Sequence, residues 1–239
     1  MSANFDTIVS RTGISGEKLR KEIEVMEALQ SLMLILTNEG EEFALYGGTA
    51  LNKIYFGSKQ RLSYDIDIES FSYTSTEKLL RKICGLAIPF DKAARFTYKN
   101  VQIDLTKAQM IEEPKLYLAK SLLNFFDYPI ASVNVVSYSL EYLMARKTMA
   151  LLSRMVNKDI YDAWMGFQSM KDKKKYKNYL DKLAVSEKTD IKYLVAQLKF
   201  YHEKKYIRDT EVNIEALGFP SPGIMVGDIL LQLKKAGFG

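Results

Sequence analysis

Hydrophobic and polar positions follow two different rhythms in the first part of the chain. Over residues 17–37 the apolar positions recur at spacings of three and four, which predicts an amphipathic helix. These positions are Ile23, Met26, Leu29, Met33 and Leu36. Residues 43–46 then read as a short buried strand closed by Gly47 and Gly48, and residues 49–55 as a helix that begins directly at those glycines. Strands and helices are therefore mixed from the start of the chain.

Two further segments alternate strictly between apolar and polar residues. In residues 64–68 this alternation places Asp65 and Asp67 on one face of a predicted strand. Residues 75–87 are helical by period, and residues 96–106 contain a second alternating strand with Asp104 on its polar face. A third short strand is expected at residues 133–136.

Beyond these strands the pattern is helical only. Helices are expected at residues 139–155, 158–170, 172–184, 189–205 and 224–236, the last after a break at residues 220–223. The predicted fold class is therefore α+β, with a small mixed-sheet domain at residues 1–137 and an all-helical domain at residues 138–239.

Composition narrows the chemistry. The single cysteine excludes an internal disulfide, and the single histidine excludes a metal site built on two histidines. No apolar stretch approaches the roughly 20 residues that cross a bilayer, and the N-terminal residues lack a basic segment followed by an apolar run. We therefore expect a cytoplasmic protein with no membrane partner, whose chemistry uses carboxylates, lysines, arginines and backbone amides.

The glycine pair and the acidic strands are the first candidates for a site. A glycine turn that opens a helix exposes backbone amides to a phosphate, although most such pairs only make turns. Asp65 and Asp67 lie about 7 Å apart along their strand. Mg²⁺ or Mn²⁺ between them would offset their repulsion, and a solvated acidic strand face is the alternative. If Asp104 joined them, three acids around metal would suit nucleotidyl or phosphoryl transfer.

The helical part supplies three more candidates. Lys147 interrupts the apolar stripe of its helix, so its ammonium needs an acid or phosphate partner unless it reaches the surface at the rim. Asp159 and Asp162 lie three residues apart, hence on one side of their helix. Asp159 is also placed to complement the helix dipole, so which of the two is the functional acid stays open.

These motifs together resemble the polymerase-β-like minimal nucleotidyltransferases, and within them the AbiEii toxin group of type IV toxin–antitoxin systems that includes the MenT proteins. The resemblance spans residues 43 to about 170 and is most specific from the glycine pair to the acidic strand. The matching segments, in order, are residues 47–51 (GGTAL), residues 61–67 (RLSYDID), Asp104, Lys147 and residues 158–162 (KDIYD).

The resemblance implies a role for each matching residue. Gly47, Gly48 and Thr49 would hold the phosphates of an NTP substrate, assisted by Arg61 and Ser63. Asp65, Asp67 and Asp104 would bind Mg²⁺, or Mn²⁺, and Asp104 would help to activate the acceptor hydroxyl. In the helical domain Lys147 would contact the triphosphate, and Asp159 or Asp162 would position the lysine or the base.

The acceptor that the resemblance implies is RNA, chiefly the 3′ end of tRNA, with a cognate antitoxin protein as partner. Residues 171–205 carry 11 lysines against five acids, interleaved with aromatic residues, which suits an RNA backbone and exposed bases. Surface helices with core aromatics are the plainer interpretation. Two other functions stay open: an inactive binding module on the same fold, and a transferase acting on a small-molecule hydroxyl.

Overall fold

The structure is a computed structural model that describes residues 5–85, 87–90, 93–204 and 219–238. It divides into two compact units, Met1–Tyr138 and Ser139–Gly239. The sequence-based domain boundary between residues 137 and 138 lies one residue before this division.

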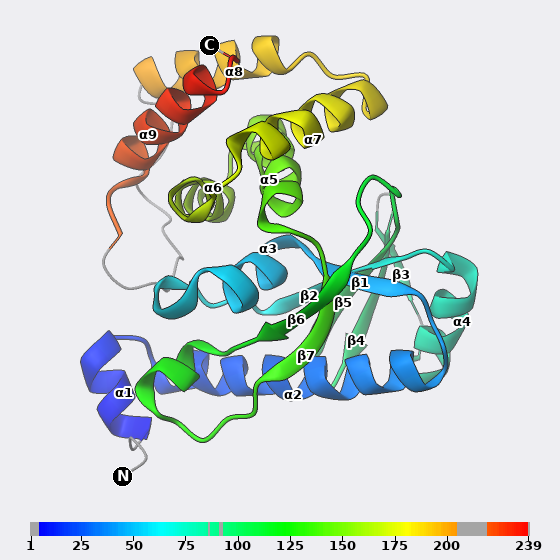
Figure 1. Cartoon of the computed structure of the whole chain (residues 1–239). Coiled ribbons are helices and arrows are strands. Elements are labelled where there is room, and N and C mark those ends of the chain that lie inside the picture. The colour runs from blue at the N-terminus through cyan, green and yellow to red at the C-terminus, as the bar shows by residue number, and fades with distance from the viewer. Residues whose placement is uncertain (1–4, 86, 91–92, 205–218, 239) are drawn as a thin grey trace. The chain divides into compact units, whose positions relative to one another are not determined.

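The first unit is built around a mixed sheet of seven strands in the order β3-β4-β5-β2-β1-β7-β6 (Figure 1). Strand β2 pairs in parallel with β5, and β1 with β7, while the other neighbours are antiparallel. This mixed sheet, followed by helices only, confirms the predicted fold class. The strands are β1 (Phe43–Tyr46), β2 (Asp65–Ser70), β3 (Ile88–Phe90), β4 (Ala93–Tyr98), β5 (Val101–Lys107), β6 (Lys115–Ala119) and β7 (Val133–Ser137).

The region expected to contain one alternating strand, residues 96–106, belongs to two. Strands β4 and β5 form a hairpin in which Tyr98 pairs with Val101 across a two-residue turn. Both turn residues have positive φ, 48° at Lys99 and 62° at Asn100, which is the type I′ geometry that matches strand twist. Lysine is an unusual first residue for this turn, so the sequence signal was weak. Strands β3 and β6 were not predicted.

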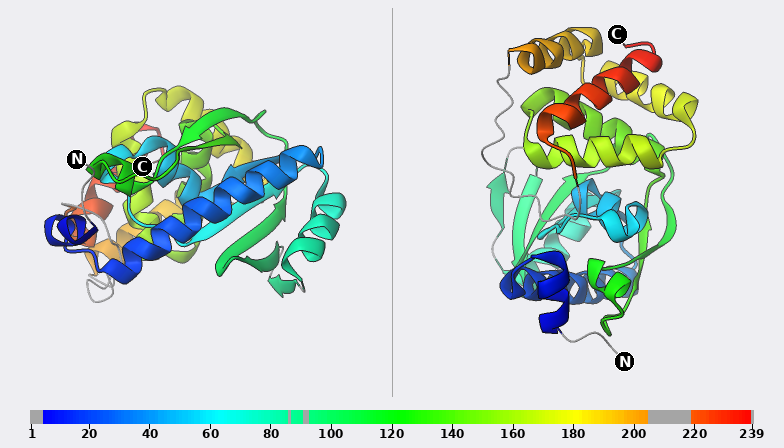
Figure 2. Two further views of the ribbon diagram at one scale, coloured as in Figure 1. Left: turned by 90° about the horizontal axis from the view of Figure 1, so that it is seen from below. Right: turned by 90° about the vertical axis from the view of Figure 1, so that its left-hand side faces the viewer.

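Helix α2 (Gly16–Asn38) runs across the sheet (Figures 1 and 2). It starts at Ser15, whose side chain accepts a hydrogen bond from the backbone N–H of Lys18, and it contacts β2, β5 and β7. Of its predicted apolar stripe Met26, Leu29, Met33 and Leu36 are buried, while Ile23 is partly buried. The other helical segments of this unit are α1 (Phe5–Thr12), α3 (Gly47–Ala50), η1 (Leu51–Tyr55), η2 (Gly57–Lys59), α4 (Tyr73–Cys84) and η3 (Leu122–Phe126).

The second unit is helical throughout its described residues. Its helices are α5 (Leu140–Arg154), α6 (Asn157–Ser169), α7 (Lys173–Ser186), α8 (Ile191–Glu203) and α9 (Pro222–Lys235). The start of α9 corrects the sequence-based expectation, because Pro222 is the first residue of that helix and does not break it. Among the described helices of the chain, none combines the length and the apolar character needed to span a membrane.

Candidate active site

The glycine turn is fitted tightly against the acidic strand. Gly47 follows β1 with a φ of +71°, a conformation that residues other than glycine rarely adopt. A Cβ atom on Gly47 would lie 2.0 Å from Oδ2 of Asp67, so a side chain there would force the Asp67 carboxylate to move. The expected helix at residues 49–55 is instead one α-helical turn, α3, continued by the π-helical turn η1. Wider turns of this kind occur often at functional sites.

Two small hydrogen-bond networks hold the turn. The hydroxyl of Thr49 lies 2.9 Å from that of Ser63 and 2.5 Å from the carbonyl oxygen of Asp65. Ser63 in turn donates to Oδ1 of Asp65 at 3.1 Å. The glycine turn and the first acid are therefore linked through two hydroxyl groups, both of them buried.

The second network runs through Asn52, a buried residue that the sequence reasoning missed. Its side-chain amide donates to the carbonyl of Gly48 at 2.8 Å and accepts from the backbone N–H of Arg61 at 2.8 Å. The Arg61 guanidinium is buried and donates to the carbonyl of Leu62 at 3.0 Å. Arg61 thus lies beside the turn, and part of its hydrogen-bonding capacity serves the local backbone.

The strand register places the acids in one row. Tyr46 on β1 pairs with Asp67 on β2, Asp67 pairs with Asp104 on β5, and Asp104 pairs with Arg95 on β4. Paired residues of neighbouring strands point to the same face of a sheet. Asp65 lies on that face two residues before Asp67, opposite Gln102. The structure therefore brings Asp104 next to the Asp65 and Asp67 strand, as the three-acid hypothesis required.

Arg95 is the residue in this row that the sequence reasoning did not include. Its Nε and Nη2 atoms each lie 2.7 Å from one carboxylate oxygen of Asp104. The hydrogen bond to Asp104, assisted by attraction to the Asp104, Asp65 and Asp67 charges, raises the pKa of Arg95. In the sequence, Arg95 is an arginine nine positions before Asp104, and its pairing with Asp104 cannot be inferred until the hairpin is known.

The residue types suit a divalent cation, because carboxylate oxygens are the ligands that Mg²⁺ and Mn²⁺ prefer. In the arrangement described, however, both oxygens of Asp104 are bound by Arg95. Among the described residues, no three His, Cys, Asp or Glu side chains are grouped so that they could hold a metal ion. The carboxylates are thus in register but not assembled around a common point.

A fourth carboxylate continues the same strand face. Glu69 lies two residues beyond Asp67, is fully buried, and accepts a hydrogen bond from the hydroxyl of Tyr138 at 2.8 Å. The alternation of β2 extends to this residue, so its position could have been inferred from the sequence. Its burial and phenolic partner distinguish it from Asp65 and Asp67, which are partly exposed.

Lys147, Asp159 and Asp162 form a buried ionic cluster within the second unit. The Lys147 ammonium lies 2.9 Å from Oδ1 of Asp159 and 3.0 Å from Oδ2 of Asp162, and both aspartates are fully buried. Arg154 adds a 2.5 Å contact from Nε to Oδ2 of Asp159. Burial alone would raise the pKa of Asp159, but Lys147 and Arg154 outweigh it and lower that pKa. Of the acid or phosphate partner expected for Lys147, the structure shows acids, and both Asp159 and Asp162 contact the ammonium.

The lysine-rich stretch divides into core and surface aromatics. Tyr176 and Tyr179 are buried, which matches the plainer interpretation for these two residues. On α8, in contrast, Tyr193 is 61% exposed and Phe200 is 51% exposed. Tyr206, the first residue after this stretch, lies outside the described residues.

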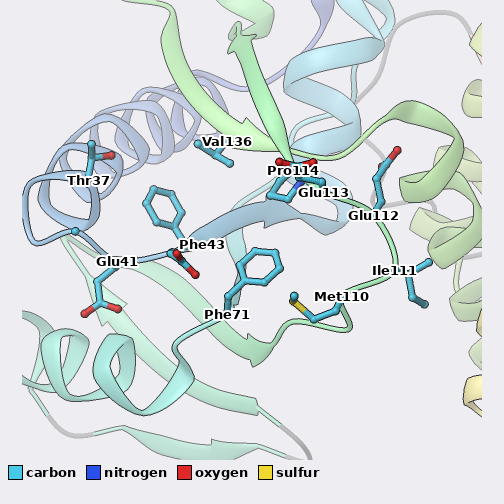
Figure 3. Close-up of a pocket in the computed structure, with 12 residues that line it drawn as sticks. Thr37, Glu41, Phe43, Phe71, Met110, Ile111, Glu112, Glu113, Pro114 and Val136 are labelled. Carbon is cyan, nitrogen blue, oxygen red and sulfur yellow. The ribbon is translucent and has the colours of Figure 1, made fainter.

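The first unit also contains a cavity of about 650 Å³ at the other end of β1. Figure 3 shows Phe43, Phe71 and Met110 close together among its lining side chains, with Glu41 and Glu112 farther out. Phe43 pairs with Ser70, whereas Tyr46, next to the glycine turn, pairs with Asp67. Of the described lining residues four are glutamate and none is lysine or arginine, so a triphosphate would meet repulsion there. The lining of this cavity therefore does not suit a nucleotide.

Comparison with known families defines the class of protein. The family described as "Nucleotidyl transferase AbiEii toxin, Type IV TA system" matches residues 28–209, which is most of the chain. The protein is therefore a nucleotidyltransferase. More narrowly, it belongs to the AbiEii toxin family, as the motifs of the glycine turn and acidic strand predicted. No protein with a curated description matches the chain.

Two solved structures are similar to this one. The first is MenT4, the nucleotidyltransferase toxin Rv2826c from Mycobacterium tuberculosis H37Rv, with a TM-score of 0.58 and 13% identity, covering 98% of this chain and 88% of that chain. At that identity the likeness shows a shared fold. The second is the antibiotic-resistance factor ANT(2'')-Ia, with a TM-score of 0.49 and 13% identity over 75% of this chain and 97% of that chain, a likeness too small to define a common fold.

Proposed function

We propose that the protein transfers an NMP from an NTP to an acceptor hydroxyl of RNA, most specifically the 3′ end of tRNA. The observation that carries the proposal is that the Asp67 carboxylate lies in the space left by the missing Cβ of Gly47, which puts a turn suited to phosphates beside a row of acids. Membership of a family of toxic nucleotidyltransferases supports the reaction class.

Each residue then has a chemical task. Backbone amides at Gly47, Gly48 and Thr49 bind the phosphates, while Ser63 orients Asp65 through its hydrogen bond. Arg61 supports the turn from the side. A divalent cation, Mg²⁺ or Mn²⁺, bound by Asp65, Asp67 and Asp104 would neutralise charge on the triphosphate.

The transfer itself is an in-line displacement at the α-phosphorus. The acceptor oxygen forms a bond to that phosphorus, the bond to the β-phosphate oxygen breaks, and pyrophosphate leaves. We assign the hydroxyl proton to Asp104, which lies in the same row as Asp67. For Lys147 we propose the triphosphate contact that the family resemblance implies, with Asp159 and Asp162 holding its ammonium in place.

Charge and exposure support RNA as the acceptor. The surplus of six lysines in residues 171–205 would attract a phosphate backbone, and the exposed rings of Tyr193 and Phe200 offer stacking surfaces for bases. A cytoplasmic location follows from NTP and tRNA as substrates. The family also implies a cognate antitoxin that restrains the activity.

A labelling experiment tests the proposal. The protein is incubated with each α-labelled NTP in turn, with Mg²⁺ or Mn²⁺ and total RNA, and the products are separated by size. We expect one NTP to label RNA of tRNA length, with no transfer by Asp67→Asn and full transfer by Asp127→Asn, an exposed acid in a left-handed turn that asparagine tolerates. Label on a small molecule, or on nothing, would reject the RNA acceptor.

A further inference from the structure

Arg95 and Asp104 form a bidentate ion pair inside the candidate active site. The two N–H···O contacts of 2.7 Å use both oxygens of the carboxylate, and the side-chain amide of Gln102 adds a third donor at 3.2 Å. A guanidinium fork matched to a carboxylate is among the strongest pairings available to side chains. Asp104 is therefore held in one orientation before any ligand arrives.

The pair differs from an ordinary surface salt bridge. Only 28% of the Arg95 side chain and 14% of the Asp104 side chain are exposed, so solvent screens the pair only in part. Arg95 also shares the sheet face that carries Asp65 and Asp67, whose charges contribute to raising its pKa. Its positive charge therefore lies on the sheet face that carries three carboxylates.

A divalent cation at Asp104 would compete with this arginine for the same oxygens. The guanidinium cannot lose its proton at any relevant pH, so its charge leaves the site only when the side chain moves. A cation that approaches while Arg95 remains meets a like charge. It must also replace at least one of the two hydrogen bonds.

We propose that Arg95 is a positioning residue that acts through Asp104: it stands in for a cation in the metal-free site and gives up the carboxylate when metal and nucleotide bind. The inference rests on the proposed function, since it requires these acids to bind metal. It predicts that metal alone binds weakly. The negative charge of an NTP would supply the attraction that draws Mg²⁺ in against the arginine.

The test is a titration with Mn²⁺ alone, followed by the magnetic resonance signal of free Mn²⁺, without NTP. Arg95→Gln should bind Mn²⁺ roughly tenfold more tightly than the native protein, the scale of one charge-assisted pair. Arg95→Lys keeps the charge but loses the fork and should fall between the two. The matched control is Arg81→Gln, which removes an arginine paired with Glu77 on α4. It should leave Mn²⁺ binding unchanged.

The same titration in an Asp104→Asn background separates two modes of action. If Arg95 acts through Asp104, Arg95→Gln should add little tightening there. Tightening of equal size in that background would overturn the inference, because Arg95 would then be a remote charge acting on Asp65 and Asp67. Unchanged Mn²⁺ affinity of folded Arg95→Gln and Arg95→Lys proteins would overturn it as well.

A metal-free measurement completes the test. In EDTA, Arg95→Gln should lower the melting temperature because Asp104 loses its counter-ion, and adding Asp104→Asn should restore part of the loss. Failure of restoration contradicts the coupling without touching the reaction. Conversely, RNA labelling by the native protein decides the proposed function whatever Arg95 does, so the two ideas can fail separately.

Discussion

The Asp67 carboxylate lies in the space that a Cβ atom on residue 47 would fill, so glycine is the residue that fits there. Gly47 has a φ of +71°, which other residues rarely adopt, and the absent Cβ leaves room for Oδ2 of Asp67. A side chain at position 47 would therefore require the Asp67 side chain to shift from its place on the paired strand β2. The missing Cβ of Gly47 therefore matters both for the shape of the turn and for the position of the Asp67 carboxylate.

Replacing Gly47 with alanine should therefore damage both stability and transfer. Left-handed strain contributes about 1–2 kcal/mol and the forced contact with Asp67 a further 1–3 kcal/mol or so. Gly13→Ala is the matched control, since Gly13 has a φ of +68° with nothing within 4 Å of the added Cβ. Urea unfolding of both variants measures the difference. Equal losses would mean that Asp67 moves aside freely.

The two strand acids should behave as functional rather than structural residues. Asp65→Asn and Asp67→Asn each remove one of two neighbouring charges on β2, so their melting temperatures in EDTA should equal or exceed the native value. NMP transfer should fall below detection in both, because the metal-binding charge is lost. A large fall in melting temperature, or transfer within a few-fold of native, would count against the site.

What the sequence could reveal about single residues depends on how local the signal is. Asp65, Asp67 and the glycine pair lie in short segments whose alternation and turn chemistry are legible without tertiary structure. The role of Arg95 follows only from strand pairing across the hairpin, and the role of Asn52 only from its position in a π-helical turn. The alternation of β5 placed Asp104 on the polar face of its strand, where it pairs with Asp67, but its arginine partner was not visible in the sequence.

Among the elements, α5 and α6 are joined by charge as well as by packing. Gly166 of α6 has no room for a Cβ, which would lie 1.7 Å from the sulfur of Met144 on α5. This close approach brings Lys147 between Asp159 and Asp162. The lysine therefore has a structural duty in addition to any contact with a nucleotide.

Lys147→Met should lower the free energy of unfolding by about 3–5 kcal/mol, because two buried carboxylates lose their shared partner. Lys199→Met is the control: its pair with Glu203 is 3.9 Å long and exposed, so the change should stay within about 0.5 kcal/mol. Chemical unfolding compares the two. Lys147→Arg keeps the charge, so it tests phosphate binding apart from the loss of stability. Its KM for NTP measures that binding.

The pH dependence of stability should carry the signature of Asp159. Its pKa is lowered in the folded protein, so the stabilisation is complete above the pKa of the unfolded carboxyl, about 3.9, and is lost as the pH falls through the lower folded value. Melting temperatures measured from pH 6 to pH 3 should fall less steeply for Asp159→Asn than for the native protein. Parallel curves would contradict the coupling to Lys147 and Arg154.

Element prediction succeeded where a segment carries its own period and failed where pairing decides. Helix α2 could be predicted because apolar residues recur at helical spacing along it, and the structure buries most of them. Strand β6, by contrast, exposes Leu116 and Leu118 at 70% and 47%, so its apolar residues point away from the core that would explain them. It exists because β7 pairs with it. Strand β3 is likewise a short edge strand, defined by its pairing with β4.

At the scale of the whole chain, charge is distributed unevenly. The net charge is +5, and residues 171–205 alone contribute a surplus of six lysines over acids. Composition could reveal this surplus, but not which aromatic residues within it are buried. Tyr176 packs against Phe167 in the core of the second unit, while Tyr193 and Phe200 are left at the surface of α8.

The lysine cluster at the start of α7 should contribute to RNA affinity through phosphate contacts. Each contact releases condensed counterions, so affinity for RNA should fall steeply with added salt, while affinity for NTP alone should change much less. Replacing Lys173, Lys174 and Lys175 with glutamine should weaken RNA binding across sequences and flatten the salt slope by roughly one unit per lost contact. Binding measured by fluorescence anisotropy at several salt concentrations gives both quantities.

The matched control changes the same charge elsewhere: Lys78, Lys82 and Lys107, all exposed in the first unit, replaced together by glutamine. If net charge alone attracts RNA, both triple variants weaken binding equally, and the α7 cluster has no special role. If only the α7 variant lowers affinity and slope, the phosphate contacts are local to α7. If neither variant changes RNA affinity or the salt slope, these lysines are surface residues of the helical unit that do not bind RNA. Their role is then limited to local contacts, such as the 3.0 Å contact of Lys173 with Gln232 and the position of Lys175 over the Tyr179 ring.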